Sequence, residues 1–405
     1  MPTYLRPGVY VEELESEDPL YRSRSALVHP AGQVVEPVRA GRPRWVAEHS
    51  IAAFVGLAAS GPAHLPVLIQ SWQEFEQRFG GVVDGCYLGH AVRGFFSNGG
   101  EHCYVLRVND SEVIDTGPDD VVGEASDRTG LSGLEAIKDI SFVCIPDVMT
   151  LHQRGILDME AVKAVQISLI AHCEFMGDRI AILDCPGGMS PQQIKQWRLE
   201  VTGYDSKYAA LYYPWIRVAG PDYRTVLVPP SGHVAGVHAR ADLHRAAANE
   251  PIRGAVGLET DLLLGEQDQL SPVGVNALVG LPGRGLLVWG ARTLSSDPEW
   301  RFLRKRRLAN FINRNIVNGT DWVIFKNAWD RSIRQGIARD LGDLLATLWR
   351  SGLLRGDEPE DAYYVKCDEE NNPAEVVDSN TIMAECAAAM ADGSQLNFRV
   401  VYFMG

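Results

Sequence analysis

Several features that common functions require are missing from this sequence. Lysine and arginine number 38 against 52 aspartate and glutamate residues in a chain of 405, so the net charge is −14 at pH 7. Binding to nucleic-acid phosphates needs a basic face, and this balance argues against one. No apolar run approaches the roughly 20 residues that a membrane-spanning helix requires. The N-terminal sequence MPTYLRPGVYVEE lacks the apolar centre of a secretory signal peptide.

Motifs for cofactors and metals are missing as well. The sequence contains no G-x-G-x-x-G, no Walker lysine motif and no H-E-x-x-H. Its seven cysteines are an odd number without a C-x-x-C pair, which suits a reduced cytoplasm better than a disulfide framework. We therefore expect no cofactor, no metal and synthesis in the cytoplasm.

What is present is an alternation of apolar strands and amphipathic helices. A chain of this length has two domains as the default expectation. The pattern predicts strands at 51–57, 103–108, 140–145, 180–183, 209–218, 258–264 and 362–367, and helices at 72–79, 88–97, 158–176, 191–201, 233–249 and 330–351. Strands that alternate with helices indicate βαβ units, and hence an open parallel sheet covered by helices.

The stretch 281–300, LPGRGLLVWGARTLSSDPEW, combines three local signals. Residues 282–285 are turn chemistry, because glycine tolerates positive φ and proline fixes its own. Residues 286–289 are a short apolar run that suits a buried strand. Asp297 is the expected cap of a helix that begins at Pro298. The stretch is therefore expected to form a turn, a core strand and a helix start.

Candidate catalytic residues do not assemble into a known arrangement. Ser231 and His233 are two residues apart, which is too close for a nucleophile and its base. The spacings of His233, His238 and His244 spread them around a helix at about 100° per residue, so a shared metal-binding face is not expected. Cys185 follows a predicted strand, where α/β proteins hold ligands, but a lone cysteine there is more often core packing. The sequence thus favours a structural role for all of them.

Charge is unevenly distributed in the second half of the chain. The basic residues are Arg301, Arg304, Lys305, Arg306, Arg307 and Arg314. On a helical wheel, Arg304 and Arg307 fall within the arc of Trp300 and Phe311, which predicts that they are partly buried and paired. Residues 357–378 contain nine acidic residues and one lysine. Such opposed patches suggest packing between copies of the chain; a solvated helix and an acidic loop are the alternative.

Both ends of the chain are β-prone. Residues 9–11, Val-Tyr-Val, lie between a Pro-Gly turn and an acidic run, with too little apolar surface to fold alone. A frayed terminus is the simpler interpretation of residues 1–25, and a strand donated to another sheet is the alternative. Residues 396–404 are almost wholly apolar. An unpaired apolar strand promotes aggregation, so this strand is expected to need a partner.

A series of longer segments matches one protein family, in order, across most of the chain. These are PGVYVEE (7–13), FVG (54–56), FEQRFGG (75–81), FFSNGGEHCYVLRV (95–108), YYPW (212–215), PPSGHVAGVHAR (229–240), PGRGLLVWGARTLSSDPEWRF (282–302), LWRSGLLRG (348–356) and VKCD (365–368). They resemble the contractile tail sheath proteins of phages and related injection systems. The sequence departs from that family at 245–249, where RAAAN stands for a Trp-Lys-Ala-Pro-Ala-Asn type of segment. It also lacks the usual Pro-Ala-Glu-Phe near the C-terminus.

The resemblance implies a fold with α/β and α+β parts. It predicts an outer α/β domain of subtilisin-like topology without a working triad, an inner C-terminal α+β domain, and extended arms that donate strands to neighbouring subunits. The expected divisions are an N-terminal arm at 1–25, the outer domain at 26–255, the inner sheath domain at 256–395 and a C-terminal donor strand at 396–405. The expected strand donors are Val9, Tyr10, Val11, Leu396, Phe398, Val400 and Tyr402.

The resemblance also implies a function. The chain is expected to be a structural subunit, not an enzyme, that forms stacked hexameric discs around an inner tube and contracts to drive the tube through a target envelope. Its partners would be further copies of itself, the tube protein, and baseplate and terminal cap proteins. The charged residues expected to face the tube or another subunit are Arg301, Arg304, Lys305, Arg306, Arg307 and Arg334. Assembly would occur in the bacterial cytoplasm, into a phage tail or a tail-like particle that can be released. A cytosolic α/β hydrolase-like enzyme is the alternative.

Overall fold

The computed structural model describes residues 6–14, 50–109, 116–220, 224–241, 243 and 245–405. The chain forms two compact units, one from residues 48–310 and one from residues 1–47 and 311–405. We call them the α/β unit and the terminal unit. The division falls inside a single helix, α10 (Leu303–Thr320), between Asn310 and Phe311. The predicted division at residue 255 is therefore not where these units separate.

A nine-stranded sheet organises the α/β unit. Its order is β10-β13-β12-β7-β6-β5-β2-β4-β3, and the pairs from β12 to β4 are parallel. The strands are β2 (Ile51–Gly56), β3 (Val67–Ile69), β4 (Cys103–Arg107), β5 (Ile140–Cys144), β6 (Ile180–Asp184), β7 (Ala209–Tyr213), β10 (Glu250–Pro251), β12 (Val275–Leu281) and β13 (Gly285–Val288). Because helices cover a parallel sheet on its faces, its central strands are buried throughout, as β6 and β7 are.

Capping residues explain where helices of the α/β unit begin and end, as α2 shows. Ser71 caps α2 by accepting from the Glu74 N–H, and Gly80 ends it in the left-handed region at φ 84°. The helices are α2 (Trp72–Phe79), α3 (Leu88–Ser97), α4 (Pro118–Val122), η1 (Leu131–Ala136), α5 (Val148–Gln153), α6 (Met159–Met176), α7 (Pro191–Gln196), η2 (Trp197–Thr202), α8 (Ser231–Arg240), α9 (Leu264–Leu270), η4 (Ser271–Val273) and η5 (Pro298–Trp300). The predicted parallel sheet with helices between its strands is confirmed.

Three local predictions for the α/β unit are wrong. The strand expected at 209–218 is interrupted at Pro214, which cannot donate to a ladder. Its second half, β8 (Ile216–Ala219), instead joins β9 (Thr225–Val228) and β11 (Ala255–Leu258) in a separate three-stranded sheet. The expected helix 233–249 ends at Arg240, and the expected strand 258–264 is the end of β11 followed by the start of α9.

The stretch 281–300 forms most of what its residues predict. Gly283 and Gly285 adopt φ values of 74° and 76° in the turn between β12 and β13. Asp297 caps the following helical turn by accepting from the Glu299 N–H at 2.8 Å. Since β12 and β13 pair with each other, and β12 also pairs with β7, this stretch belongs to the α/β unit. It had been expected to be the core of a separate inner domain.

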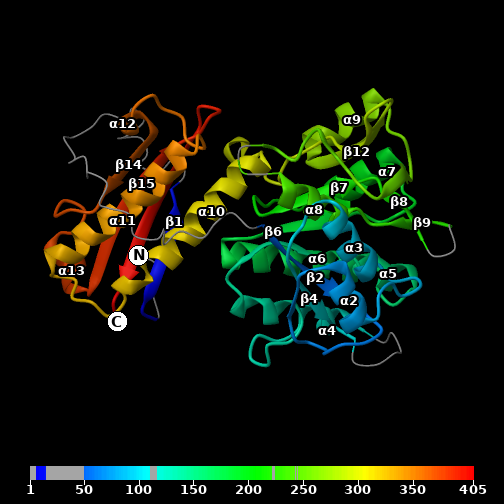
Figure 1. Ribbon diagram of the computed structural model, residues 1–405, viewed down its shortest axis with the longest axis horizontal. Helices are drawn as coiled ribbons and strands as arrows, with labels where there is room; N and C mark the ends of the chain where they lie inside the picture. The colour runs from blue at the N-terminus through cyan, green and yellow to red at the C-terminus, as the bar shows by residue number, and fades with distance from the viewer. Residues whose placement is uncertain (1–5, 15–49, 110–115, 221–223, 242, 244) are drawn as a thin grey trace. The chain divides into compact units, whose positions relative to one another are not determined.

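The terminal unit is a four-stranded antiparallel sheet with helices. Its order is β1-β16-β15-β14, and α11 packs on β14 and β15 (Figure 1). Its strands are β1 (Gly8–Glu13), β14 (Tyr363–Lys366), β15 (Thr381–Ala389) and β16 (Gln395–Phe403), and its helices are the second half of α10, η6 (Asp321–Val323), α11 (Arg331–Arg350), α12 (Pro359–Ala362) and α13 (Ala374–Asp378). Figure 1 shows β1 and β16, the blue and red strands at opposite ends of the sequence, side by side.

Candidate functional site

The terminal sheet brings together all of the residues predicted to donate strands. Val9, Tyr10 and Val11 lie opposite Tyr402, Val401 and Val400, respectively. On its other side, β16 pairs with β15 over nine residues, from Gln395 opposite Ala389 to Phe403 opposite Thr381. The predicted strands at the two ends of the chain are therefore neighbours in one sheet. Nothing in their local sequences indicated that they would pair with each other.

The two faces of this sheet differ in chemistry. One face is the core of the unit, and the residues of β15 and β16 on it are Ile382, Ala384, Cys386, Ala388, Leu396, Phe398, Val400 and Tyr402, all buried. Burial alternates along most of β16, whereas β15 is buried on both faces over most of its length. The opposite face bears the charged side chains of Glu12, Glu385, Lys366 and Arg399 together with apolar ones, among them Ala387 and Val401.

The apolar C-terminal strand needs a partner, as its sequence predicts, and it has two within its own chain. β16 is an inner strand, since β15 lies on one side and β1 on the other. β1 is the edge strand, and all six of its residues are only half-buried. A strand-donating role for residues 396–403 would therefore require taking apart the middle of the sheet. The geometry favours β1 as the exchangeable strand.

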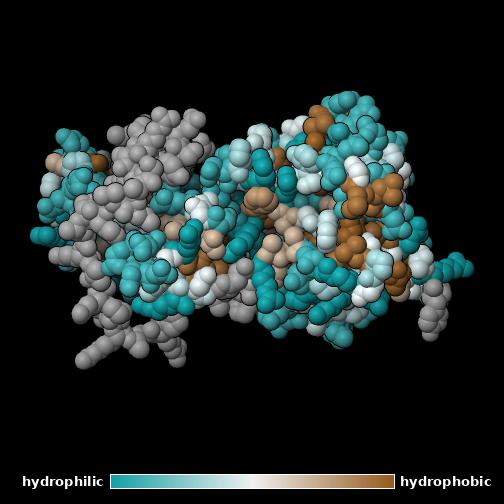
Figure 2. Space-filling view, turned by 90° about the horizontal axis from the view of Figure 1, so that it is seen from above, coloured by the Kyte–Doolittle hydropathy of each residue, from teal (hydrophilic) through white to brown (hydrophobic). Residues whose placement is uncertain are grey.

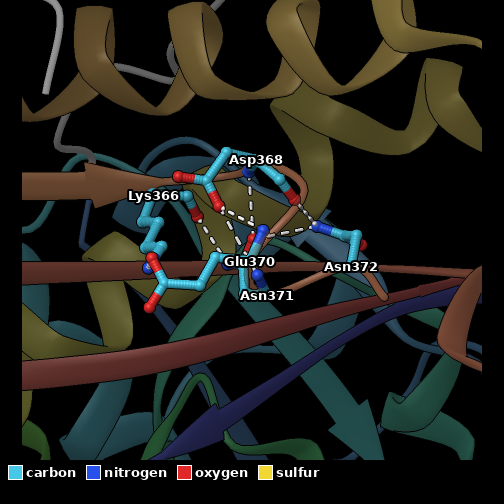
Figure 3. A network of polar contacts seen from close by, with 5 residues as sticks. All are labelled: Lys366, Asp368, Glu370, Asn371 and Asn372. Carbon is cyan, nitrogen blue, oxygen red and sulfur yellow. Dashed lines mark hydrogen bonds and ion pairs between the residues drawn. The ribbon is translucent and has the colours of Figure 1, made fainter. Parts of the chain in front are cut away.

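Polar contacts among its own residues hold the loop after β14 together (Figure 3), and Asn372 joins this loop to β15. The Asn372 side-chain amide accepts from the Met383 N–H at 2.7 Å and donates to the Met383 carbonyl oxygen at 2.8 Å, so it acts as one residue of a β-ladder. The Asp368 carboxylate accepts from the backbone N–H of Glu370 and Asn371, and Lys366 forms an ion pair with Glu370. Part of the predicted acidic patch is therefore engaged in contacts within the loop that follows β14.

Replacing Asn372 tests this role of the loop. The Asn372→Ala substitution is expected to destabilise the terminal unit by about 2 kcal/mol, because it leaves the Met383 N–H and carbonyl without their partner in a place that is nearly closed to water. Asn371→Ala, which removes contacts made within the turn, is the comparison and should cost less. Urea unfolding with a probe in this unit would measure both; equal values for the two variants would contradict the ladder role.

Most of the basic residues predicted to face a partner are buried and make contacts within the chain. Arg306 is fully buried, with its guanidinium 4.3 Å from the ring centre of Tyr208 and 4.5 Å from that of Trp300. Arg307 donates to the carbonyl oxygens of His238 and Ala241 at 3.0 and 2.9 Å.

The remaining basic residues divide by their exposure. Lys305 is buried in an ion pair with Glu299, and Arg334 is buried and donates to the Ala328 carbonyl. Arg304 is half-buried and Arg301 exposed. Contact with a tube or another subunit stays a prediction for all six residues, of which Arg301 and Arg304 are the most accessible in the single chain. The helical wheel predicted partial burial for Arg304 and Arg307, and the structure confirms it: Arg304 is half-buried and Arg307 is buried. The wheel did not predict the burial of Arg306, which is the most buried of the six.

The serine considered as a nucleophile is part of a closed polar pair in the α/β unit. Ser231 Oγ donates to Asp184 Oδ2 at 2.5 Å, and the Ser231 N–H donates to Asp184 Oδ1 at 2.9 Å. Asp184 ends β6 and Ser231 begins α8, so the pair fixes the helix to the sheet. Both residues are buried. The arrangement is a structural link between α8 and β6.

The other candidate catalytic groups are buried in the same region. His238 Nε2 lies 2.8 Å from the Tyr212 hydroxyl oxygen, and Cys185 Sγ donates to the Tyr212 carbonyl. Burial raises the pKa of the Cys185 thiol well above its usual range, which disfavours the reactive thiolate. His233 is buried as well, and His244 lies outside the described residues. Among the residues that the structure describes, no three His, Cys, Asp or Glu side chains are placed to hold a metal, and no helix could cross a membrane.

The Asp184 link predicts a pH dependence of stability. Burial raises the pKa of Asp184 from 3.8 to about 7. A raised folded-state pKa means that the stability contribution of the neutral carboxyl is full below about pH 4 and is lost as pH rises to about 7. Asp184→Asn keeps an acceptor for the Ser231 N–H and a donor for Oγ and cannot ionise, so at pH 7 we expect it to be more stable than the parent by up to about 4 kcal/mol. Urea unfolding at pH 4.5 and 7.5 measures this, and parallel pH profiles for the two proteins would contradict it.

Comparison with known protein families gives the identity of the fold. The family model of the phage tail sheath protein central domain matches residues 133–294, and that of the phage tail sheath C-terminal domain matches residues 295–401. Together the two models cover more than half of the chain. The chain belongs to the phage tail sheath family. The family resemblance inferred from the sequence segments is thereby confirmed.

Related sheath proteins agree with this assignment. The chain is 24% identical over 304 residues to a putative prophage major tail sheath protein of Pseudomonas aeruginosa, covering 73% of this chain and 75% of that one. It is 26% identical over 185 residues to the tail sheath protein of Vibrio phage KVP40, covering 44% of this chain but only 26% of that longer protein.

Solved sheath structures share the fold over most of the chain. The contracted helical sheath of the anti-feeding prophage superposes with a TM-score of 0.69 at 22% identity, covering 90% of this chain and 96% of that one. The contracted sheath complex of the extracellular contractile injection system PVC gives 0.69 at 21%, covering 89% and 93%. The mixed α/β architecture is therefore that of sheath subunits.

The strand that completes the site, β15, is not predicted by its sequence. β15, TIMAECAAA, is rich in alanine and contains few of the residues that favour strands, so no strand was predicted there. Two signals were present. Apolar residues occupy 382, 384, 386 and 388 without a break, and Asp392-Gly393 precedes the next apolar run, as is typical of a hairpin turn. Glu385, on the charged face, was missed with the strand.

Proposed function

We propose that this chain is the structural subunit of a contractile sheath, which polymerises as stacked hexameric discs around an inner tube and contracts to drive the tube through a target envelope. Its partners would be other copies of the chain, the tube protein, and baseplate and terminal cap proteins. We propose no enzymatic step, nucleic-acid partner or membrane insertion. Assembly would take place in the bacterial cytoplasm, and the product would be a phage tail or a tail-like particle.

The observation that carries this proposal is the edge position of β1. Six residues pair with β16 at the rim of the terminal sheet, and residues 15–49 join them to the α/β unit. Fully extended, a segment of that length would span on the order of 100 Å. The β1 strand of one copy is therefore able to reach β16 of another and form the same ladder. Each backbone hydrogen bond adds about 1 kcal/mol net, so one such strand supplies a few kcal/mol to a subunit contact.

Exposed apolar side chains support self-association as well. Leu263 and Leu264, at the start of α9, are 71% and 79% exposed in the single chain. Figure 2 shows hydrophobic surface gathered on the α/β unit in the view from above. Apolar surface of this kind is typical of protein contact sites. The hydrolase alternative has less support, because Ser231 and Cys185 are both buried.

Electron microscopy tests the proposal most directly. Purified chain, alone or co-expressed with a candidate tube protein, is expected to form hollow helical cylinders. Solutions that contain only monomers at high concentration under both conditions would contradict it. Labelling of Ser231 or Cys185 by an active-site probe in the native protein would favour the hydrolase instead.

A further inference from the structure

A row of alternating charges crosses the face of the terminal sheet that lies opposite its apolar core face. Glu12 of β1 lies opposite Arg399 of β16, and Arg399 lies opposite Glu385 of β15. Glu385 in turn lies opposite Lys366 of β14. Residues directly opposite in antiparallel strands share a face, so these four side chains form one line, negative, positive, negative, positive. Lys366 also forms an ion pair with Glu370.

The inner members of this row are closed off from water. Glu385 and Lys366 are only 7% and 8% exposed. At the β1 end, Arg399 Nη1 is 3.4 Å from Glu12 Oε2, and these side chains are 24% and 29% exposed. Buried charges such as those of Glu385 and Lys366 need partners of opposite sign. The partly buried Arg399 lies between two carboxylates, that of Glu385 on β15 and that of Glu12 on β1. The hairpin of β15 and β16 therefore presents a guanidinium at its edge that is complemented by a carboxylate on the strand docked there.

Only one register of β1 satisfies this requirement. The residues of β1 on the same face as Glu12 are Gly8 and Tyr10, and neither has a charge. A slip of two residues would place Tyr10 or Leu14 opposite Arg399. A slip of one would place Glu13 there, but it would also turn Val9 and Val11 away from the core.

We propose that Arg399 determines which strand the β16 edge accepts and in which register, and that in the assembled particle this strand is β1 of a second copy, recognised by Glu12. The register argument stands on the pairing within the sheet. The identity of the donor as a second copy rests on the proposed sheath function. The charge row thus disfavours the pairing of slipped or foreign strands with β16. The apolar face alone would not distinguish these strands from β1.

The first experiment leaves the acceptor unchanged. Glu12→Arg in the full, unassembled chain is expected to speed hydrogen exchange of the β1 amides about tenfold, because an attraction across the ladder becomes a repulsion. Glu12→Gln should have a smaller effect, and added salt should reduce that of Glu12→Arg. Glu76→Arg, an equal change in net charge at an exposed position on α2, is the control. Exchange in Glu12→Arg at the parent rate would overturn the proposal.

The second experiment asks where the donor strand comes from. All variants contain Glu385→Gln, so that a carboxylate at position 399 does not meet another in β15. Neither Glu12→Arg nor Arg399→Glu should form cylinders alone, because each has like charges opposite each other. Combining both substitutions in one chain should restore assembly. Mixing the two single variants should also restore it, since alternating copies then match every donor with an opposite acceptor.

The outcomes separate the two claims. Cylinders from the mixture support both the charge selection and the second copy as donor. Cylinders from the combined variant but not from the mixture would keep the charge selection and overturn donation between copies. Cylinders from each single variant at the parental yield would overturn the charge selection. If Glu385→Gln alone prevents assembly, the exchange rates of the first experiment decide.

Discussion

Deleting residues 1–14 is expected to leave a folded chain that no longer forms cylinders, whereas deleting residues 396–405 is expected to unfold the terminal unit. The first deletion removes an edge strand whose side chains are half-buried. The second removes an inner strand with Phe398, Val400 and Tyr402 almost completely buried. Losing a large buried side chain costs about 3–5 kcal/mol. Several such losses equal the whole stability of an ordinary domain, about 5–15 kcal/mol.

Circular dichroism, hydrogen exchange and electron microscopy of the two truncated chains would measure these effects. A chain that lacks only residues 1–5 keeps β1 and is the matched control, which should still assemble. Normal cylinders from the chain without residues 1–14 would overturn the role of β1 in assembly. A folded, protected β14–β15 pair in the chain without residues 396–405 would show that the C-terminal strand is dispensable for the fold, contrary to its place in the sheet.

Replacing Asp147 by Ala is expected to destabilise the α/β unit by about 3–5 kcal/mol. Asp147 follows β5 and is buried. Oδ2 accepts from the N–H of Leu57 and Leu88, and Oδ1 accepts from the N–H of Tyr87 and the Thr150 hydroxyl. Burial raises the pKa of this carboxyl and the four donors oppose that rise. Asp147→Ala would leave three backbone N–H groups without an acceptor.

The isosteric Asp147→Asn variant distinguishes this site from Asp184. Each Asp147 oxygen faces at least one backbone N–H, which can only donate, so an amide nitrogen in either position meets a donor. Asp147→Asn should therefore cost at least about 2 kcal/mol, whereas Asp184→Asn should not destabilise, because the Ser231 hydroxyl can reverse its role. Urea unfolding of both variants at pH 7 tests this contrast. Equal stabilities for the two would contradict the proposed hydrogen-bond polarity.

The same carboxylate explains part of the family resemblance. The FVG segment ends at Gly56, where a Cβ would lie 2.5 Å from Asp147 Oδ2. A side chain there would displace the group that joins the ends of β2 and β5 to the start of α3. The glycine was recognisable in the sequence as part of a motif. Its reason was not, because Asp147 is 91 residues away in the chain.

The sequence predicted well what depends on near neighbours. The helices 72–79 and 88–97 have the predicted bounds, and α11 (Arg331–Arg350) lies within the predicted helix 330–351. Their apolar periods lie within the helices themselves. β15 was missed because its alanines favour a strand only when β14 and β16 pack beside them. The division of the chain was misplaced because the pairing of β12 with β7 spans more than 60 residues.

By itself, the sequence determined the α/β pattern, the acidic balance, the lack of cofactor motifs and the family. These follow from composition, period and contiguous segments. Only the tertiary structure decided that β1 pairs with β16, that Arg306 lies between aromatic rings, and that Glu12, Arg399, Glu385 and Lys366 form one row. Pairing across a sheet joins residues nearly 390 positions apart, and the burial of a side chain depends on what packs above it. Neither the pairing of strands nor the burial of a side chain can be deduced from a local run of residues.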